Sequence, residues 1–295
     1  MITGFAIILD EDLVYVSNSK KYAFFEIILF VEKLIKSINP KNYWRLTNVL
    51  FKGLKGKEHM IIDHVIDKSG RNIFFCNTGS FSSRSIEARN MVKEFSEKVL
   101  ENYGTPEEIE KSSSKPEFTK IIKLITAYLW NKYRDNLEDE EFLKPSEEIK
   151  SKVIYCGISA QGLPIISKLY DLELLKNFQK NISKENIELF SSDLSAKLAT
   201  ITMNSQIRAK SYIKEIQFED LKEQGRKNLI LYGRINGYSL DLIASGDYLK
   251  IKEIFEELEK KLTKEPVLLQ EFKGDLKPFL SLSNHIDNIV HQFDQ

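Results

Sequence analysis

Residues 228–244 read NLILYGRINGYSLDLIA, two apolar runs that are separated by Asn236 and Gly237. Asn and Gly tolerate the positive φ angles that a two-residue turn requires, so this pattern strongly favours a β-hairpin. The apolar run Tyr212–Phe218 lies just before it and predicts another strand. Residues 212–244 are therefore expected to form three consecutive strands.

Helices are expected on both sides of these strands. Before them, Ile187–Ile207 carries apolar side chains at helical spacing. After them, Asp247 is placed to cap a helix that ends at Leu262. The other elements predicted for this half are a last helix over Leu276–Phe293 and an opening hairpin made of Lys152–Ser159 and Leu163–Tyr170.

The first half of the chain predicts the same order of elements. Its expected elements are strands 2–9 and 13–17, helix 22–38, strands 44–51, 59–66 and 72–78, and helices 83–103 and 116–134. Glu107–Lys115 is polar and is interpreted as a linker between the last two helices. The chain therefore predicts a tandem repeat, with one domain at 1–134, a linker at 135–151 and a second domain at 152–295. The second domain carries an insertion at 171–186.

The order strand–strand–helix–three strands–two helices resembles that of the longin domain. The hairpin tip Gly162-Leu163-Pro164-Ile165 is followed by the helix sequence FSSDLSA at 190–196. Together they are similar to the opening of archaeal longin-like and roadblock-like proteins. The resemblance implies an α+β fold of two longin-like domains. Each would be a five-stranded antiparallel sheet with one helix on one face and two on the other.

The same resemblance implies protein–protein interaction as the function. Longin domains occur in vesicle-fusion proteins, coat adaptors and tethering complexes, and paired longin domains form exchange-factor complexes of Rab-type GTPases. The expected partner is a small Ras-like or Rab-like GTPase, or another longin or roadblock protein, including a second copy in a dimer. The expected role is guanine-nucleotide exchange or vesicle trafficking and tethering. Two alternatives are a coat-like scaffold that assembles without a GTPase, and a profilin-like ligand sensor of the PAS or GAF kind with a polar internal pocket.

Composition excludes several other classes of protein. The 295 residues contain 43 Lys and Arg against 43 Asp and Glu, so the net charge is zero and does not favour nucleic-acid binding. The most apolar stretch, Tyr22–Ile38, is interrupted by charged residues and is too polar for a transmembrane span. Ile2–Leu9 is followed at once by three acidic residues, unlike a signal peptide. A cytoplasmic protein with at most peripheral membrane contact is expected.

The sequence predicts no catalytic residue, cofactor site or metal site. Gly53–Lys57 lacks the spacing of a phosphate-binding loop and is interpreted as a turn. His59 and His64 point to opposite faces of one predicted strand, so they do not share a metal ion. Ser82 or Ser83 is expected to cap the following helix rather than act as a nucleophile. Cys76 and Cys156 are expected to be buried, unreactive thiols.

The first helix of each half shows an unusual outer face. On a helical wheel of 22–38 we assign Phe24, Ile28, Val31 and Ile35 to the core, which leaves Tyr22, Phe25 and Leu29 outside. The corresponding helix near 187–207 has a core face of Ile187, Phe190, Leu194, Leu198 and Ile201, and an outer face of small residues, namely Ser192, Ser195, Ala196 and Ala199.

A bulky face and a small face are sterically complementary. We therefore expect these outer residues to be buried against each other or against a partner. Burying Phe25 or Leu29 contributes about 1.5–3 kcal/mol each. The alternative is that the linker or the insertion covers them within the protein.

Overall fold

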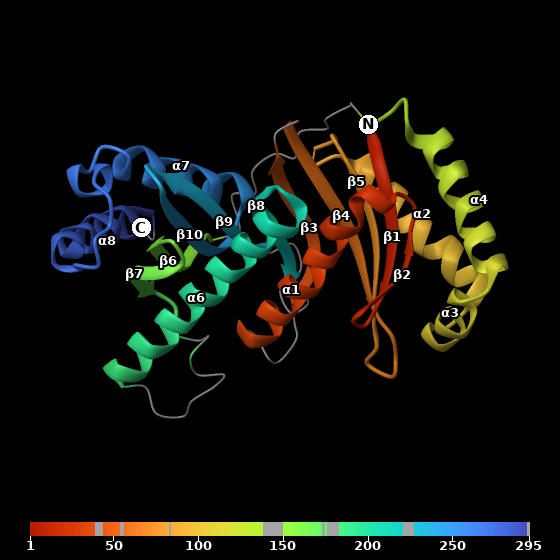
Figure 1. The fold of residues 1–295 in the computed structure, drawn as a ribbon, viewed down its shortest axis with the longest axis horizontal. Coiled ribbons are helices and arrows are strands. Elements are labelled where there is room, and N and C mark those ends of the chain that lie inside the picture. Colours follow the sequence, from red (N-terminus) through yellow and green to blue (C-terminus); the bar gives the residue numbers. More distant parts are fainter. Residues whose placement is uncertain are drawn as a thin grey trace. The chain divides into compact units, whose positions relative to one another are not determined.

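The computed structural model describes residues 1–38, 44–53, 56–82, 84–137, 150–172, 175, 183–220 and 227–293 (Figure 1). The strands of the first half are β1 (Ile2–Leu9), β2 (Asp12–Val16), β3 (Trp44–Gly53), β4 (Gly56–Ile66) and β5 (Asn72–Gly79). Those of the second half are β6 (Lys152–Ala160), β7 (Leu163–Leu169), β8 (Tyr212–Asp220), β9 (Lys227–Ile235) and β10 (Tyr238–Gly246).

The expectation of two separate five-stranded sheets is wrong. The ten strands belong to one sheet, in the order β2-β1-β5-β4-β3-β8-β9-β10-β6-β7. Every strand pair whose register is described is antiparallel. The fold remains α+β, but as one continuous sheet. An edge strand carries unpaired backbone groups that another edge can satisfy, and the side-chain pattern of a strand does not reveal such pairing.

In the described residues of both halves, one helix follows the second strand and the remaining helices follow the fifth, with three of them in the first half and two in the second. The first half contains α1 (Tyr22–Ile38), α2 (Ile86–Tyr103), α3 (Pro106–Ser113) and α4 (Pro116–Tyr133). The second half contains α6 (Lys184–Ala209), α7 (Tyr248–Leu262) and α8 (Leu280–Phe293). Short 3-10 turns occur at Ser19–Lys21, Pro266–Leu269 and Lys277–Phe279. Most of the predicted linker and insertion lies outside the described residues.

The polar segment after Gly104 was expected to be a linker, and that expectation is wrong. It forms α3, whose N-cap Thr105 accepts a hydrogen bond from the backbone N–H of Glu108. Pro106 occupies the first turn of the helix, where its missing N–H costs nothing. Ile109 is buried beneath the helix. Thr105 and Pro106 are therefore typical of a helix start. The segment was not predicted as a helix because one apolar residue, Ile109, does not form a helical pattern.

The chain divides into two compact units. Unit 1 comprises residues 1–30, 46–143 and 205–213, and unit 2 comprises residues 31–45, 144–204 and 214–295. In unit 1, α2, α3 and α4 cover one face of the strands, where Phe95 packs edge-on against Phe5 and Phe75 (Figure 1). The start of α1 covers the other face, where Phe25 lies beside Gly4 of β1.

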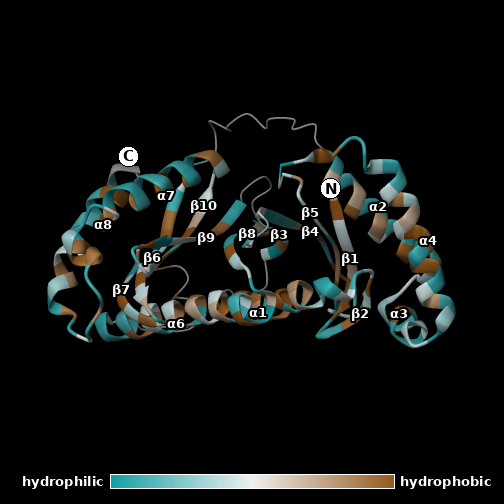
Figure 2. Ribbon diagram, turned by 45° about the horizontal axis from the view of Figure 1, so that its top comes forward, coloured by the Kyte–Doolittle hydropathy of each residue, from teal (hydrophilic) through white to brown (hydrophobic). Residues whose placement is uncertain are grey.

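Unit 2 has its own core. Helices α7 and α8 pack on one face of the strands through Phe255, Leu258, Leu282 and Ile286. Hydrophobic and hydrophilic residues alternate around these helices, as they do along α2 and α4 in unit 1 (Figure 2). Helix α6 covers the other face, where its Ser195 lies near Tyr155 of β6.

Local signals in the sequence account for several turns and caps. The predicted hairpin at Asn236 and Gly237 is confirmed, with φ angles of 50° and 96° and with Ile235 paired to Tyr238. The predicted cap at Asp247 is also confirmed, since its carboxylate accepts hydrogen bonds from two backbone N–H groups. The N-cap of α2 is Ser85, not Ser82 or Ser83. Several serines precede this helix, and it is the hydroxyl of Ser85 that accepts a hydrogen bond from the backbone N–H of Ala88.

Candidate functional site

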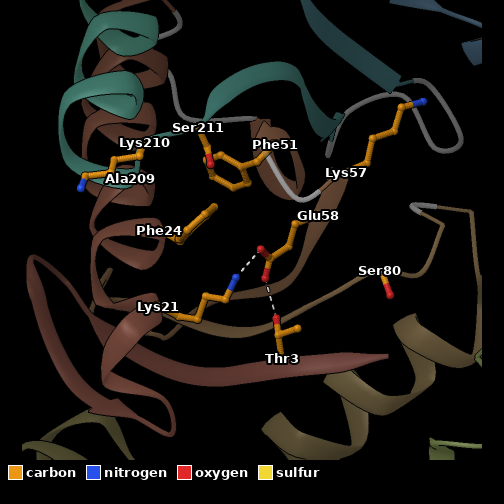
Figure 3. Close-up of a pocket in the computed structure, with 12 residues that line it drawn as sticks. Thr3, Lys21, Phe24, Phe51, Lys57, Glu58, Ser80, Ala209, Lys210 and Ser211 are labelled. Carbon is orange, nitrogen blue, oxygen red and sulfur yellow. Dashed lines mark hydrogen bonds and ion pairs between the residues drawn. The ribbon is translucent and has the colours of Figure 1, made fainter.

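A cavity of about 440 Å³ lies within unit 1 (Figure 3). Its lining comes from the start of β1, the start of α1, the facing ends of β3 and β4, the end of β5 and the residues that join α6 to β8. The lining residues are Thr3, Lys21, Phe24, Phe51, Gly53, Gly56, Lys57, Glu58, Ser80, Ala209, Lys210 and Ser211. This volume lies within the range of pockets that hold small organic ligands.

An ion pair forms one wall of the cavity. The ammonium group of Lys21 contacts the carboxylate of Glu58, and both side chains are largely buried, at 18% and 16% exposure. The hydroxyl of Thr3 donates a hydrogen bond to the other oxygen of Glu58 at 2.5 Å. The Thr3 hydroxyl also lies 2.9 Å from that of Thr78. Glu58 is therefore held on both oxygens and has a defined orientation.

Two aromatic rings stand beside the ion pair. The rings of Phe24 and Phe51 meet edge to face, with centroids 4.9 Å apart and an interplanar angle of 76°. The ammonium nitrogen of Lys21 lies 4.5 Å from the centroid of the Phe24 ring, within the range of a cation–π contact. Figure 3 shows both rings on the same side of the ion pair. The cavity thus combines an apolar wall with a pair of opposite charges.

The turn before α1 positions Lys21 and Phe24. The side-chain oxygen of Asn18 accepts a hydrogen bond from the backbone N–H of Lys20, and its amide nitrogen donates to the carbonyl of Thr3 at 3.0 Å. Asn18 therefore starts the helix and ties it to β1 at the same time. This link places the first turn of α1 over the end of the strand.

Glycine and serine shape the opposite wall. A Cβ on Gly53 would lie 2.9 Å from the hydroxyl oxygen of Ser211, so only glycine permits this close approach without a shift. The segment of Ser211 is held by Ser205, whose hydroxyl donates to the Ser211 carbonyl at 2.6 Å. Ser205 in turn accepts a hydrogen bond from the backbone N–H of Ile213. The wall is thus defined by hydrogen bonds as well as by packing.

The residues proposed for the outer face of α1 have different environments. Phe25 is fully buried against β1, so its assignment to the outer face is wrong. Leu29 is half-buried, and Tyr22 is 48% exposed. Phe24, assigned to the core, lines the cavity instead. The helix is apolar around most of its circumference, so the wheel alone did not determine which side faces the sheet.

The residues proposed for the outer face of α6 also divide into two groups. Ser195 and Ala199 are buried, whereas Ser192 and Ala196 are exposed. The expected core residues Leu194, Leu198 and Ile201 are buried as predicted, whereas Ile187 and Phe190 are only half-buried. Ser192 and Ala196 therefore remain as the accessible part of the proposed small-residue surface.

The cavity itself was not found from the sequence. Gly53, Gly56 and Lys57 belong to a segment that was interpreted only as a turn, and no binding role was predicted for Glu58 or Ser211. The lining combines residues about two hundred positions apart in the chain, so it depends on tertiary structure. The one local signal was the spacing of Lys21 and Phe24, which lie three residues apart where α1 begins.

No family model matches this chain, and no curated protein matches it either. Within the part of the chain that the structure describes, no helix is long and apolar enough to cross a membrane. In the same residues, no group of three or more His, Cys, Asp or Glu side chains is arranged to hold a metal ion. Cys76 and Cys156 are buried and unpaired, as predicted.

Proposed function

We propose that this protein is a non-enzymatic interaction module that binds a small Ras-like GTPase, as an exchange factor or as a trafficking subunit. The observation that supports the proposal most is the order strand–strand–helix–three strands, followed by helices, which recurs in both halves of the chain. Because this order resembles the one found in paired longin proteins, the function of such pairs is the natural proposal for this chain.

The chemistry of nucleotide exchange is compatible with this protein. An exchange factor displaces contacts between a GTPase and its nucleotide, and it does so by binding rather than by acid–base or nucleophilic catalysis. The surfaces proposed for the contact are the exposed Tyr22 on α1 in unit 1, and the exposed Ser192 and Ala196 on α6 in unit 2. Tyrosine is enriched among residues that dominate binding energy at interfaces.

The release of fluorescent GDP from small GTPases of the source organism tests the proposal. The account predicts that the full chain binds at least one of these GTPases and that an exchange factor accelerates GDP release. Binding without acceleration supports a trafficking or tethering subunit. No binding and no acceleration across the whole set would overturn the proposal. Light scattering should then be measured, because stable oligomers would favour a scaffold that assembles without a GTPase.

A second candidate function is ligand sensing. The observation that favours it is the cavity of unit 1, which lies between strand ends and a helix and is lined by polar as well as apolar groups. A ligand bound there would contact α1, whose outer surface is one of the proposed partner surfaces. Ligand sensing and GTPase binding are therefore compatible, and each is tested separately.

A further inference from the structure

We infer that the cavity of unit 1 binds a zwitterionic ligand with an apolar side chain, of which a free aromatic α-amino acid is the simplest class. This inference rests on the ligand-sensing function proposed above and names its ligand chemistry. It does not depend on GTPase binding.

The charges in the wall favour a ligand that carries both signs. Lys21 and Glu58 are adjacent and opposite in charge. An anionic group that approaches Lys21 also comes close to Glu58 and is repelled by it, and a cationic group meets the same difficulty with Lys21. A zwitterion avoids both repulsions. Its carboxylate pairs with the Lys21 ammonium while its own ammonium pairs with the Glu58 carboxylate.

The polar groups are already oriented for such a ligand. Thr3 donates to one oxygen of Glu58, and Lys21 contacts the other. Lys21 is further held over the ring of Phe24. A site whose groups are fixed before binding loses little conformational freedom when the ligand arrives. The ligand separates Lys21 from Glu58 and replaces this one ion pair by two protein–ligand pairs, while Thr3 continues to hold Glu58.

The apolar wall selects the side chain of the ligand. Figure 3 shows the Phe24 and Phe51 rings next to the ion pair, and the Phe24 ring centroid lies 4.5 Å from the ammonium nitrogen of Lys21. Phe51 is buried, but Phe24 is only half-buried, so part of its ring is available for contact. An aromatic side chain would complete an edge-to-face or offset-stacked cluster with these rings.

The dimensions of the cavity are consistent with a ligand of this class. About 440 Å³ is enough for a small organic molecule and for water molecules around its charged groups. Gly53, Gly56 and Ala209 line the cavity without large side chains that would fill it. Lys57 and Lys210 also border the cavity, but Figure 3 shows their side chains pointing away from it, so neither is included among the ligand contacts.

Calorimetric titration of the full chain with four compounds tests the inference. L-Phenylalanine carries both charges and an aromatic ring. N-acetyl-L-phenylalanine lacks the positive charge, L-phenylalaninamide lacks the negative charge, and L-alanine lacks the ring. We expect L-phenylalanine to bind and each of the other three to bind at least about tenfold more weakly, because each loses one of the contacts described above.

The variant Glu58→Gln provides a readout that general damage to the fold would not produce. It should weaken the binding of L-phenylalanine about tenfold or more. It should strengthen the binding of N-acetyl-L-phenylalanine, because the Glu58 carboxylate no longer repels the carboxylate of this compound. The matched control is Glu97→Gln, an exposed glutamate on α2 of the same unit, which should leave all four affinities unchanged.

Two results would overturn the inference. One is the absence of binding by all four compounds to the parent chain. The other is equal binding of L-phenylalanine and its N-acetyl derivative, which would show that the ammonium group is not recognised. Neither result affects the GTPase proposal, which is measured by GDP release without these compounds, so the two failures are distinguishable.

Discussion

Asp241 of β10 lies directly opposite Tyr232 of β9, and both side chains are buried without a hydrogen-bond partner among the described residues. The hydroxyls of Tyr155 and Ser195 are also buried without a hydrogen-bond partner among the described residues. Burial raises the pKa of Tyr155, and the tyrosine is near enough to Asp241 for the charge of that carboxylate to raise this pKa further. Burial raises the pKa of Asp241 to about 7. It also raises the pKa of Tyr232, an effect that the charge of Asp241 increases.

The buried Asp241 should make the stability of the protein depend on pH. The pKa rises from 3.8 in the unfolded chain to about 7 in the folded protein, so the folded state holds this proton more tightly. Stability is therefore highest below pH 4 with respect to this group and falls as the pH rises to about 7. The full loss is on the order of 4 kcal/mol. Asp241→Asn should remove this slope and be more stable than the parent protein at pH 8.

Urea denaturation of both proteins between pH 4 and pH 8 measures this effect. The control is Glu253→Gln, an exposed glutamate on α7 of unit 2, which should keep the parental slope. Parallel pH profiles for the parent and Asp241→Asn would contradict the assignment of a raised pKa to Asp241.

Gly157 should not tolerate a side chain, because the Tyr155 side chain occupies the space that a Cβ would need. A Cβ at Gly157 would lie 2.2 Å from the hydroxyl oxygen of Tyr155, which occupies the space above the glycine. Gly157→Ala should therefore lower the free energy of unfolding by about 1–3 kcal/mol. Adding Tyr155→Phe should recover part of this loss, because it removes the closest atom. Thermal unfolding of the two single variants and the double variant gives the coupling, and strict additivity would refute the steric explanation.

Helix capping gives a pair of opposite predictions. The carboxylate of Asp247 caps α7, so Asp247→Ala should destabilise the protein by about 1 kcal/mol. Lys115 occupies the N-cap position of α4 in an extended conformation but makes no side-chain cap. Lys115→Asp should therefore stabilise by about 0.5–1 kcal/mol. Chemical denaturation measures both changes. Unchanged stability of Asp247→Ala would contradict the cap at α7, and a less stable Lys115→Asp would contradict the prediction for α4.

The order of the strands and of every helix except α3 was predictable because these elements carry local signals. The positive φ angles of the Asn236-Gly237 turn and the cap at Asp247 depend on a few neighbouring residues, and both were predicted correctly. The single ten-stranded sheet was not predictable in this way. Side-chain alternation indicates which residues lie in a strand, but it does not identify the neighbours of that strand.

The environment of α1 was harder to predict than its existence. Phe24 and Phe25 are adjacent and identical, so the choice of the one that faces the sheet depends on the exact rotation of the helix. The structure buries Phe25 and leaves Phe24 at the cavity. Glu58 and Ser211 were missed because neither belongs to a recognised motif, and they meet only after the chain has folded.

The proposed partner surface on α1 can be tested with a matched pair of tyrosines. Tyr22 on α1 is 48% exposed and Tyr128 on α4 is 47% exposed, so the two side chains offer similar surface to a partner. Tyr128 also contacts Lys98 and Lys132, so thermal unfolding of both variants accompanies the binding measurement. Tyr22→Ala should weaken GTPase binding about tenfold or more, as expected for an interface tyrosine, while Tyr128→Ala should not. Interferometry measures both dissociation constants. Equal effects of the two variants would exclude this surface of α1 as the specific contact.

The most direct test of the account is equilibrium binding of the intact chain to each small Ras-like GTPase of its source organism. Each GTPase should be measured with GDP, with a non-hydrolysable GTP analogue and without nucleotide. The account predicts saturable binding to at least one GTPase, with an affinity that changes with the nucleotide state. For an exchange factor, binding should be tightest to the nucleotide-free form. The absence of saturable binding to every GTPase in every state would contradict the account.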